Sequence, residues 1–188
     1  MAWLSFVDEL PHRPARVLVA GTSGSGKSTL AQHLAVLLEL RYAELDALHH
    51  GPNWMPRREF MEDVARFAAG SRWATEWQYP AVRELLAERA DLLVLLDLPR
   101  RVVMTRVVRR TLSRRVRQTE LWNGNVEPPL RTIVSDRDHI IRWAWRTHHD
   151  HLPRVTRCAE RHPTLPVVRL KTHGQIEDWL AGPLKRVA

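Results

Sequence analysis

The hydrophobic positions of this chain fall into five short apolar runs, separated by longer segments in which apolar residues recur at helical spacing. The runs are Arg16–Ala20, Tyr42–Leu45, Trp73–Thr75, Leu92–Leu96 and Pro166–Leu170. Short strands that alternate with helices are typical of a parallel sheet with helices on both faces. The pattern therefore predicts an α/β fold, a three-layer sandwich on a five-stranded parallel sheet, with residues 1–188 in a single domain.

Helix signals stand between these runs. Apolar residues at helical spacing mark a helix over Leu30–Leu38, and Pro56, Pro80 and Pro99 are of the residue type favoured at the start of a helix. The helix opened by Pro56 is expected over about 56–69, and the one opened by Pro99 is expected to be the longest.

The second half of the chain is less regular. Gln118–Leu130 breaks the helical period and is predicted to be a loop. Ser135 fits the N-cap of a helix from Asp136 to about His151, and a break is expected after it, near Pro153. A short closing helix is expected over Gln175–Leu180.

A glycine-rich segment follows the first apolar run directly and leads into the first helix. A strand, a glycine-rich turn and a helix together form a phosphate-binding P-loop, in which backbone N–H groups surround phosphate oxygens and the helix N-terminus adds positive potential. Lys27 is expected to reach the terminal phosphates, and the Ser28 hydroxyl is expected to bind Mg²⁺. The residues expected to bind a nucleoside triphosphate are Gly21, Thr22, Ser23, Gly24, Ser25, Gly26, Lys27, Ser28 and Thr29.

Three acids follow the second, third and fourth runs, where an open parallel sheet places its ligands. Asp46 is expected to orient or deprotonate a phosphoryl acceptor, with a turn or helix-capping role as the alternative. Glu76 and Asp97 are the candidates for holding Mg²⁺. Because Leu98 and Pro99 follow Asp97 at once, capping the next helix is an equal alternative for that residue.

Arginines recur along one face of the long helix, at positions 106, 110, 114 and 117. This face leads into the irregular segment that begins at Gln118, which we expect to close over the nucleotide as a lid. At least two of Arg106, Arg110 and Arg114 are expected to contact the nucleotide or the transferred phosphate, Arg110 and Arg114 in catalysis. The alternative is a solvated helix face.

The remaining candidates are aromatic or composition-based. Trp54 lies in a loop between two prolines, where it either stacks on an acceptor ring or anchors the loop.

The formal net charge of +8 is carried almost wholly by arginine, which fits either phosphate recognition or biased coding. Cys158 is the single cysteine, so no intrachain disulfide is expected, and Met1–Leu10 does not resemble a signal peptide. A cytoplasmic location is therefore expected.

With these residues placed, the sequence resembles the adenylate-kinase-related P-loop kinases, a group that includes shikimate and gluconate kinases. Within that group it is most similar to a bacterial family known as adenylate kinase-like or DNA topology modulation proteins. The stretches that carry this resemblance are Leu45-Asp46-Ala47-Leu48-His49, Pro52-Asn53-Trp54, Leu96-Asp97-Leu98-Pro99-Arg100, Arg109-Arg110-Thr111, Leu121-Trp122-Asn123-Gly124-Asn125 and Val168-Arg169-Leu170.

The resemblance implies a nucleotide-kinase-like core on a five-stranded parallel sheet, with a lid over about 114–130 and ATP as the nucleotide. It also implies an acceptor pocket built by Asp46 and the helix after Pro56. One departure stands out. Relatives commonly have an acid-glycine-asparagine-tyrosine run after the third strand, where this chain has Glu76-Trp77-Gln78-Tyr79. Trp77 in place of glycine is expected to crowd the space where an acceptor would contact the backbone.

The sequence thus predicts an ATP- and Mg²⁺-dependent phosphotransferase that acts on a small acceptor such as a nucleoside, a nucleotide or a related metabolite. Two alternatives come from other classes: a regulatory NTPase that grips nucleic acid through its arginines and tryptophans, and a nucleotide-binding protein that has lost catalysis. A nucleic-acid partner is less favoured than a small molecule. No membrane partner is expected, and the protein is expected to be a monomer or a homodimer.

Overall fold

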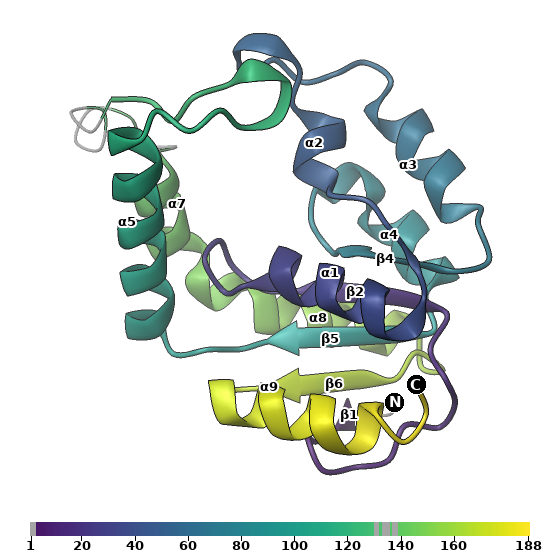
Figure 1. The fold of residues 1–188 in the computed structure, drawn as a ribbon. Coiled ribbons are helices and arrows are strands. Elements are labelled where there is room, and N and C mark those ends of the chain that lie inside the picture. Colours follow the sequence, from purple (N-terminus) through teal and green to yellow (C-terminus); the bar gives the residue numbers. More distant parts are fainter. Residues whose placement is uncertain (1–2, 130–131, 133–135, 137–138) are drawn as a thin grey trace.

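The structure is a computed structural model that describes residues 3–129, 132, 136 and 139–188. Its centre is a six-stranded sheet in the order β1-β6-β5-β2-β4-β3, in which all neighbouring strands are parallel (Figure 1). The strands are β1 (Trp3–Leu4), β2 (Arg16–Ala20), β3 (Arg41–Tyr42), β4 (Trp73–Glu76), β5 (Leu92–Leu96) and β6 (Val167–Leu170).

The predicted parallel α/β fold is confirmed, but the predicted number of strands is wrong. The additional strand, β1, pairs with β6 through Trp3↔Val167 and Leu4↔Val168. A strand of two residues is too short to produce a recognisable alternation of apolar and polar positions, which is why the sequence pattern did not reveal it.

Strand β2 lies in the middle of the sheet, between β5 and β4. All four residues after Arg16 are fully buried: Val17 and Val19 belong to the core on one face, and Leu18 and Ala20 to the core on the other. Burial on both faces explains the uninterrupted apolar run. The P-loop that follows Ala20 therefore leaves the sheet at its centre.

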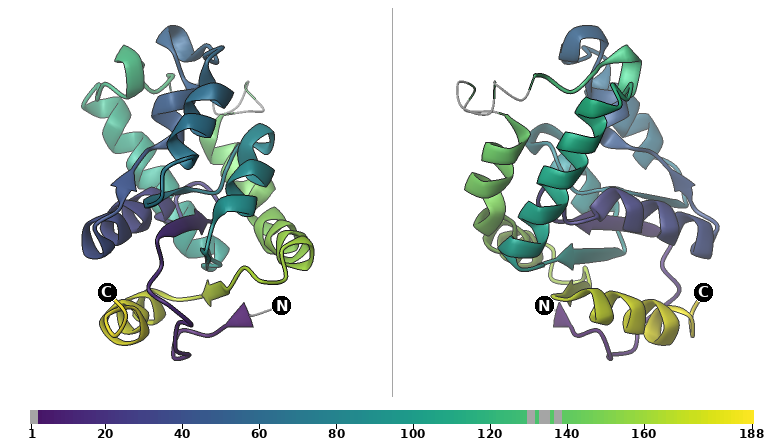
Figure 2. Two further views of the ribbon diagram at one scale, coloured as in Figure 1. Left: turned by 90° about the vertical axis from the view of Figure 1, so that its right-hand side faces the viewer. Right: turned by 60° about the vertical axis from the view of Figure 1, so that its left-hand side comes forward.

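Helices cover both faces of the sheet (Figure 2). On one face lie α1 (Lys27–Leu38) and α9 (His173–Trp179); on the other lie α3 (Phe60–Ala68), α4 (Pro80–Arg89) and α8 (His151–Arg161). Two more helices, α5 (Arg100–Val116) and α7 (Ile140–Thr147), pack on each other through a small cluster of their own. This cluster places α5 beside the carboxyl ends of the strands (Figure 1).

The second predicted strand ends early. Strand β3 stops at Tyr42, and the short helix α2 (Leu45–His49) begins three residues later. The buried Glu76 carboxylate accepts a hydrogen bond from Leu45 N at 3.1 Å, which satisfies an amide at the start of α2. Asp46 therefore lies in the first turn of α2 and not at a strand end.

Two of the three proline-marked helix starts are confirmed. Helix α4 begins at Pro80, and α5 begins directly after Pro99. Helix α3 instead begins at Phe60, so the predicted acceptor-side helix over 56–69 starts too early. Pro56 forms an isolated antiparallel bridge with His50, which holds the chain extended at this point.

The C-terminal helices also differ from the prediction. Pro153 is the third residue of α8, where its missing N–H costs no intrahelical bond, and the break falls earlier, at the 3₁₀ turn η3 (His148–Asp150). The predicted N-cap Ser135 lies outside the described residues; α7 begins later, with His139 at its N-cap. The closing helix α9 starts earlier than predicted and continues into a π-helical turn, η4 (Leu180–Leu184).

Short 3₁₀ turns interrupt two loops, η1 (Pro52–Trp54) and η2 (Trp122–Gly124). The second lies in the segment predicted to be an irregular loop. None of the helices in the described part of the chain is both long and apolar enough to cross a membrane.

The single thiol gives a direct test of this packing. Cys158 of α8 is fully buried, and burial raises the pKa of its thiol to about 11. At pH 8 about one thiol in a thousand is then ionised in the folded protein. We expect no reaction with an aromatic disulfide reagent on the minute timescale in buffer and complete reaction in denaturant. Rapid labelling of the native protein would contradict this placement of α8.

Candidate functional site

The P-loop connects β2 to α1 through a tight turn. Gly24 and Gly26 have φ angles of 83° and 93°, which other residues rarely adopt, and Ser25 N donates to Thr22 O at 3.0 Å. In the part of the chain that the structure describes, no side chain caps the N-terminus of α1, so its first amides are available to an anion. The buried hydroxyls of Thr22 and Ser25 have no hydrogen-bond partner among the described residues. These groups fit the phosphates of a nucleotide.

The other predicted phosphate-binding residues occupy this same turn. Gly21 and Ser23 lie in the loop, and Lys27, Ser28 and Thr29 form the first residues of α1. Gly21 also packs closely, because a Cβ on it would lie 3.2 Å from the Cβ of Leu96.

Gly24 sets the contact between the P-loop and α5. A Cβ at this position would lie 3.0 Å from Val103 O and closer still to Val107 Cγ2. Both valines are fully buried in the cluster that joins α5 to α7. The missing side chain therefore lets α5 approach the loop, and this approach fixes how far the arginines of α5 stand from the phosphate site.

Lys27 is close to both acidic and basic side chains. Burial lowers the pKa of its ammonium group, and the nearby carboxylates of Asp46 and Glu76 oppose that shift, while Arg110 adds to it. Within the described part of the chain Lys27 makes no hydrogen bond or ion pair of its own. A cation held this way is available to an anionic ligand.

Asp46 is held by one of its two carboxylate oxygens. Oδ1 accepts hydrogen bonds from Tyr79 Oη at 2.6 Å and from Gln78 Nε2 at 2.8 Å. Burial and the Asp46 charge both raise the pKa of Tyr79, so that its hydroxyl remains a donor. No side chain or amide of the described residues donates to Oδ2. The sequence singled out Asp46 but not these two partners, which come from the stretch that departs from the family pattern.

Glu76 is fully buried and fully engaged by the protein. Oε1 accepts from Tyr42 Oη at 2.8 Å, and Oε2 accepts from Leu45 N and from Thr75 Oγ1. The carboxylate therefore joins β4 to β3 and α2, and it acts on Lys27 through its charge.

Asp97 follows β5, on the opposite side of β2 from Glu76, and it is paired with an arginine. Its Oδ2 accepts from Arg169 Nε at 2.9 Å and from Arg169 Nη2 at 2.5 Å. This ion pair ties β5 to β6. The structure thus places Glu76, but not Asp97, among the charges that act on Lys27. No three His, Cys, Asp or Glu side chains among the described residues are grouped so that they could hold a metal ion.

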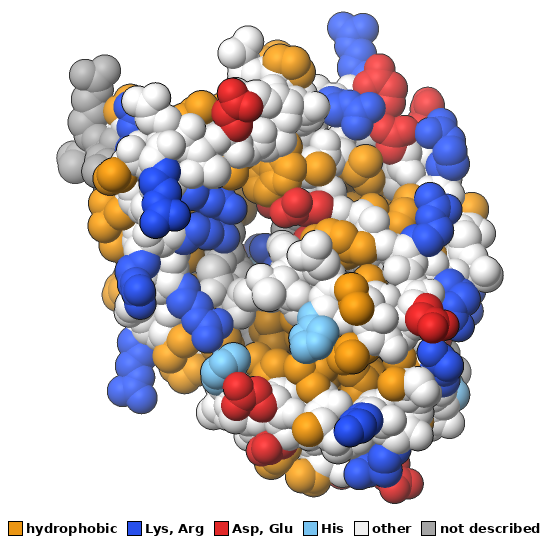
Figure 3. All heavy atoms as spheres, viewed as in Figure 1, with side chains coloured by type: hydrophobic (Ala, Val, Ile, Leu, Met, Phe, Trp, Pro, Cys, Tyr) orange, Lys and Arg blue, Asp and Glu red, His pale blue; other side chains and the backbone are white. Residues whose placement is uncertain are grey.

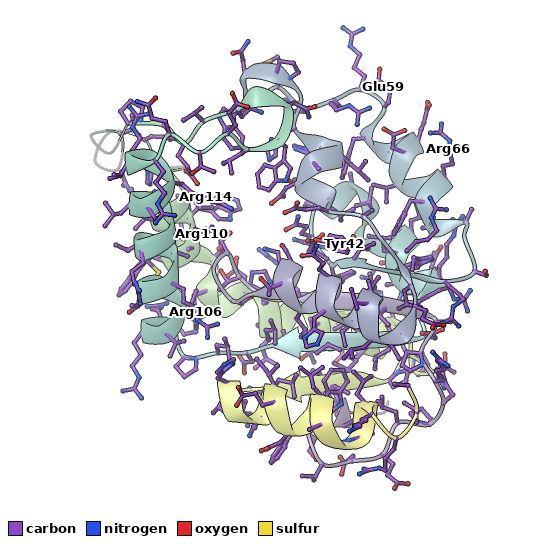
Figure 4. All side chains as sticks on the ribbon, viewed as in Figure 1. Tyr42, Glu59, Arg66, Arg106, Arg110 and Arg114 are labelled. Atoms are coloured by element: carbon purple, nitrogen blue, oxygen red, sulfur yellow. The ribbon has the colours of Figure 1, made fainter. Side chains whose placement is uncertain are left out.

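Arginines form the opposite wall of the site. Arg106, Arg110 and Arg114 follow one another along α5 (Figure 4). Arg106 Nη1 donates to Ser25 O at 3.4 Å, and Arg114 Nη1 lies 3.5 Å from Glu127 Oε1. Arg110 is largely buried, and its Nε has no hydrogen-bond partner among the described residues. Burial and the charge of Arg114 lower its pKa. The face viewed in Figure 3 is hollowed at its centre, with cationic side chains of α5 on one rim and acidic side chains across from them.

A third acid near the hollow was missed by the sequence reading. Glu44 precedes α2, and its Oε2 accepts a hydrogen bond from Trp122 Nε1 at 2.9 Å. Burial raises the pKa of Glu44, as do the charges of Glu76 and Asp46. The only signal in the sequence was its position two residues before Asp46.

Trp77 and Trp54, which the sequence analysis related to the acceptor site, both make contacts within the protein. Trp77 does not crowd the site as expected: it is 3% exposed, packs in the core, and donates from Nε1 to Arg83 O at 3.1 Å. Trp54 anchors its loop, because its Nε1 donates to Val126 O at 3.3 Å. The loop-anchoring alternative for Trp54 therefore fits the structure.

Cations also gather at the start of α8, behind the P-loop. His151 is largely buried there, and burial, followed by the charges of Lys27, Arg154 and Arg83, lowers its pKa to about 3. Arg154 pairs with Asp150 at 2.6 Å, and the guanidinium of Arg83 lies 5.5 Å from the centre of the Trp77 ring. His151 is therefore neutral at physiological pH.

Comparison with solved structures shows the fold. A gluconokinase from Sinorhizobium meliloti 1021 superposes with a TM-score of 0.54 at 22% identity, over 94% of this chain and 95% of that one. The chain has the fold of the P-loop kinases. Two further structures are more distant. A sugar kinase from a Janibacter species has a TM-score of 0.47 at 22% identity, over 95% of this chain and 99% of that one. A shikimate kinase from Acinetobacter baumannii has a TM-score of 0.39 at 19% identity, over 92% of this chain and 88% of that one. No protein-family model and no curated protein sequence matches.

The contact at Gly24 predicts the effect of one added methyl group. Gly24→Ala forces a side chain into Val107 in a left-handed backbone conformation, which we expect to destabilise the fold by about 1–3 kcal/mol. Because α5 must move away, nucleotide affinity is also expected to fall. Thermal unfolding with and without Mg²⁺·ATP measures both effects. Wild-type stability and nucleotide affinity in this variant would show that the loop and α5 are not in contact.

His151 predicts an acid-dependent loss of stability. Its pKa of about 3 in the folded state lies below its ordinary value of 6.5, so between these values only the unfolded chain takes up the proton. Stability should therefore fall as the pH drops below 6.5, by up to about 1.4 kcal/mol per pH unit from this group. Urea unfolding between pH 7 and pH 4 should show a shallower decline for His151→Gln than for the wild type. Parallel curves would contradict the burial of His151.

Proposed function

We propose that this protein is an ATP- and Mg²⁺-dependent phosphotransferase that acts on a hydroxyl group of a small acceptor. The observation that carries the proposal is the arrangement around Lys27, with a carboxylate that has a free oxygen on one side and a wall of arginines on the other. Phosphoryl transfer requires these parts: a phosphate cradle, charge neutralisation and a group that orients the acceptor. The kinase fold supports the same conclusion.

The nucleotide half of the site consists of the P-loop and α5. In this proposal the loop amides and Lys27 bind the β- and γ-phosphates. Arg106, which already contacts the loop at Ser25 O, binds the nucleotide, and Arg110 and Arg114 neutralise charge on the transferred group. An anion between these arginines and Lys27 would offset the repulsion between Arg110 and Arg114, which adds to burial in lowering the pKa of Arg110.

Mg²⁺ would be held mainly through Ser28 in the first turn of α1. The ion takes few protein ligands and keeps several waters and phosphate oxygens, so the Ser28 hydroxyl would be its main direct protein ligand. When bound, the ion would supply positive charge that offsets the negative charge of the phosphates. Of the two acids expected to assist, we assign this role to Glu76, because its charge acts on Lys27 while Asp97 is paired with Arg169.

The acceptor half consists of Asp46 and its surroundings on α2. The free Oδ2 would accept the proton of the acceptor hydroxyl while the hydroxyl oxygen forms a bond to the γ-phosphorus. The bond from that phosphorus to the β–γ bridging oxygen breaks, and ADP leaves with the bonding electron pair. Tyr79 and Gln78 keep the Asp46 carboxylate in position during the transfer.

Two substitutions separate binding from transfer. Lys27→Ala should lower kcat/KM by about a hundredfold or more and weaken ATP binding, because the terminal phosphates lose their cation. Asp46→Asn should lower kcat by about a hundredfold and change the Kd of ATP by less than about threefold. Coupled ADP release over a panel of nucleosides, nucleoside monophosphates and sugar acids, with calorimetry for ATP, measures both effects.

The exposed Arg157 of α8 offers a matched control for a lost positive charge. Arg157→Ala should leave ADP release and ATP binding unchanged. Full acceptor-dependent activity in Lys27→Ala would overturn the proposal, and so would ATP binding without acceptor-dependent ADP release across the whole panel.

A further inference from the structure

Two turns, one on the acceptor side and one in the predicted lid, have the same backbone form. Residues 50–56 and 120–126 are each closed by an isolated antiparallel bridge, His50↔Pro56 and Glu120↔Val126. Each encloses a 3₁₀ turn with an asparagine in the left-handed region, Asn53 at φ 56° and Asn123 at φ 57°. The first turn follows α2 on the acceptor side, and the second belongs to the predicted lid.

Equivalent hydrogen bonds hold the two turns. Gly51 N donates to Met55 O at 2.7 Å in the first, and Leu121 N donates to Asn125 O at 2.6 Å in the second. Met55 N and Asn125 N each bond back three residues. The repeat is one of conformation: only the asparagine at the left-handed position is shared in sequence.

The two turns bind each other, and we call this contact the clasp (residues 50–56 with 120–126). Asn125 is 4% exposed and lies at its centre. Its Oδ1 accepts from Trp54 N at 2.9 Å, and its Nδ2 donates to Gly51 O at 2.9 Å and to Trp122 O at 2.7 Å. Asn123 Nδ2 donates to His50 O as well. One buried amide thus satisfies backbone groups of both turns.

Aromatic rings fill the space between the turns. Trp54 and Trp122 are in edge contact with a centroid distance of 6.2 Å, and the His50 ring lies against both of them. These rings contact one another, which explains the tryptophans that mark both sequence stretches. The segments singled out by the family resemblance therefore form a contact between lid and acceptor side.

Each half of the clasp is connected to one half of the site. On the acceptor side, His50 Nε2 lies 3.2 Å from Tyr79 Oη, the hydroxyl that donates to Asp46. On the lid side, Glu127 follows the turn directly; its carboxylate contacts Arg114 Nη1, and its carbonyl oxygen accepts from Arg115 Nη1 at 3.2 Å. The clasp thus lies between the group that would orient the acceptor and an arginine that would meet the phosphate.

We propose that Asn125 is a positioning residue whose clasp couples the acceptor-side loop to the lid arginines. Arg114 is then held where it can meet the phosphate only while residues 50–56 keep their contact with residues 120–126. The placement of the lid therefore depends on the acceptor side as well as on the nucleotide. The catalytic consequence rests on the proposed phosphotransferase function; the coupling of the two turns does not.

The test compares Asn125→Ala with Arg114→Ala and the double variant. Losing the buried amide should raise amide hydrogen exchange about tenfold or more in both turns, in residues 50–56 and 120–126 alike. Because Asn125 acts through Arg114, Asn125→Ala should lower kcat by about tenfold with little change in the Kd of ATP. The double variant should be no slower than Arg114→Ala alone.

Asn53→Gly is the matched control. Asn53 holds the equivalent left-handed position in the same clasp but makes no hydrogen bond across it among the described residues, and glycine adopts this conformation readily. This variant should leave exchange and kcat unchanged. If Asn125→Ala does not fold, as judged by circular dichroism, Trp54→Phe is used instead. It removes the bond to Val126 O and part of the ring contact with His50 and Trp122, keeps the backbone bond to Asn125, and should raise exchange in both turns by a smaller factor.

The outcomes separate this proposal from the proposed function. Faster exchange confined to residues 120–126 would overturn the coupling, and so would rate losses from Asn125→Ala and Arg114→Ala that multiply in the double variant. If the wild type transfers no phosphoryl group, the proposed function fails. The exchange pattern in both turns then still supports or overturns the clasp as a coupling device.

Discussion

The packing of Gly24 against α5 is the contact on which the rest of the site depends. The P-loop leaves the central strand of the sheet, so its position is fixed by a core that is buried on both faces. Without a side chain at Gly24, α5 lies directly on the loop through Val103 and Val107. A helix held there brings a row of arginines to the P-loop and leads at its far end into the predicted lid. In the proposed function, phosphate binding and the geometry of this lid thus share one apolar contact.

The fold separates positive and negative charge across the hollow. Acids come from α2 and the end of β4, and arginines come from α5. Lys27 stands between them, with its own pKa lowered by burial and by Arg110 and raised by Asp46 and Glu76. Separation of this kind suits a reaction in which an anionic phosphoryl group moves toward an acceptor held by a carboxylate. Of the three acids singled out from the sequence, Glu76 is buried and fully engaged, and Asp97 is paired with Arg169. Asp46 is the one that acts on Lys27 while its Oδ2 receives no hydrogen bond from the described residues.

Much of the fold could be predicted from the sequence because local signals were strong. The apolar runs, the glycine-rich turn and Pro80 and Pro99 each act within a few residues, and the structure confirms the elements that they indicate. Strand β1 and the early end of β3 could not be predicted, since both depend on partners distant in the chain: β6 for the first, and Glu76 for the second. Pro56 misled for the same reason, because its bridge to His50 competes with helix formation.

The candidate site shows the same difference between local signals and contacts of segments distant in the chain. The P-loop and Asp46 were identified from motif and position, and they remain the basis of the proposed function. The partners that hold Asp46 and the pairing of the two asparagine turns are contacts between distant segments, which spacing along the chain does not reveal. Trp77 shows the opposite error: a bulky residue in place of glycine suggested a blocked pocket, but its ring is directed into the core.

The central claim is that the γ-phosphoryl group crosses the hollow to an acceptor hydroxyl. Following the label from ATP carrying a radioactive γ-phosphate tests this most directly, with each acceptor of the panel and with acceptor-free and Lys27→Ala controls. The account predicts label on one class of acceptor with the wild type and on none with the variant. Label that appears only as inorganic phosphate, at a rate indifferent to every acceptor, would contradict it.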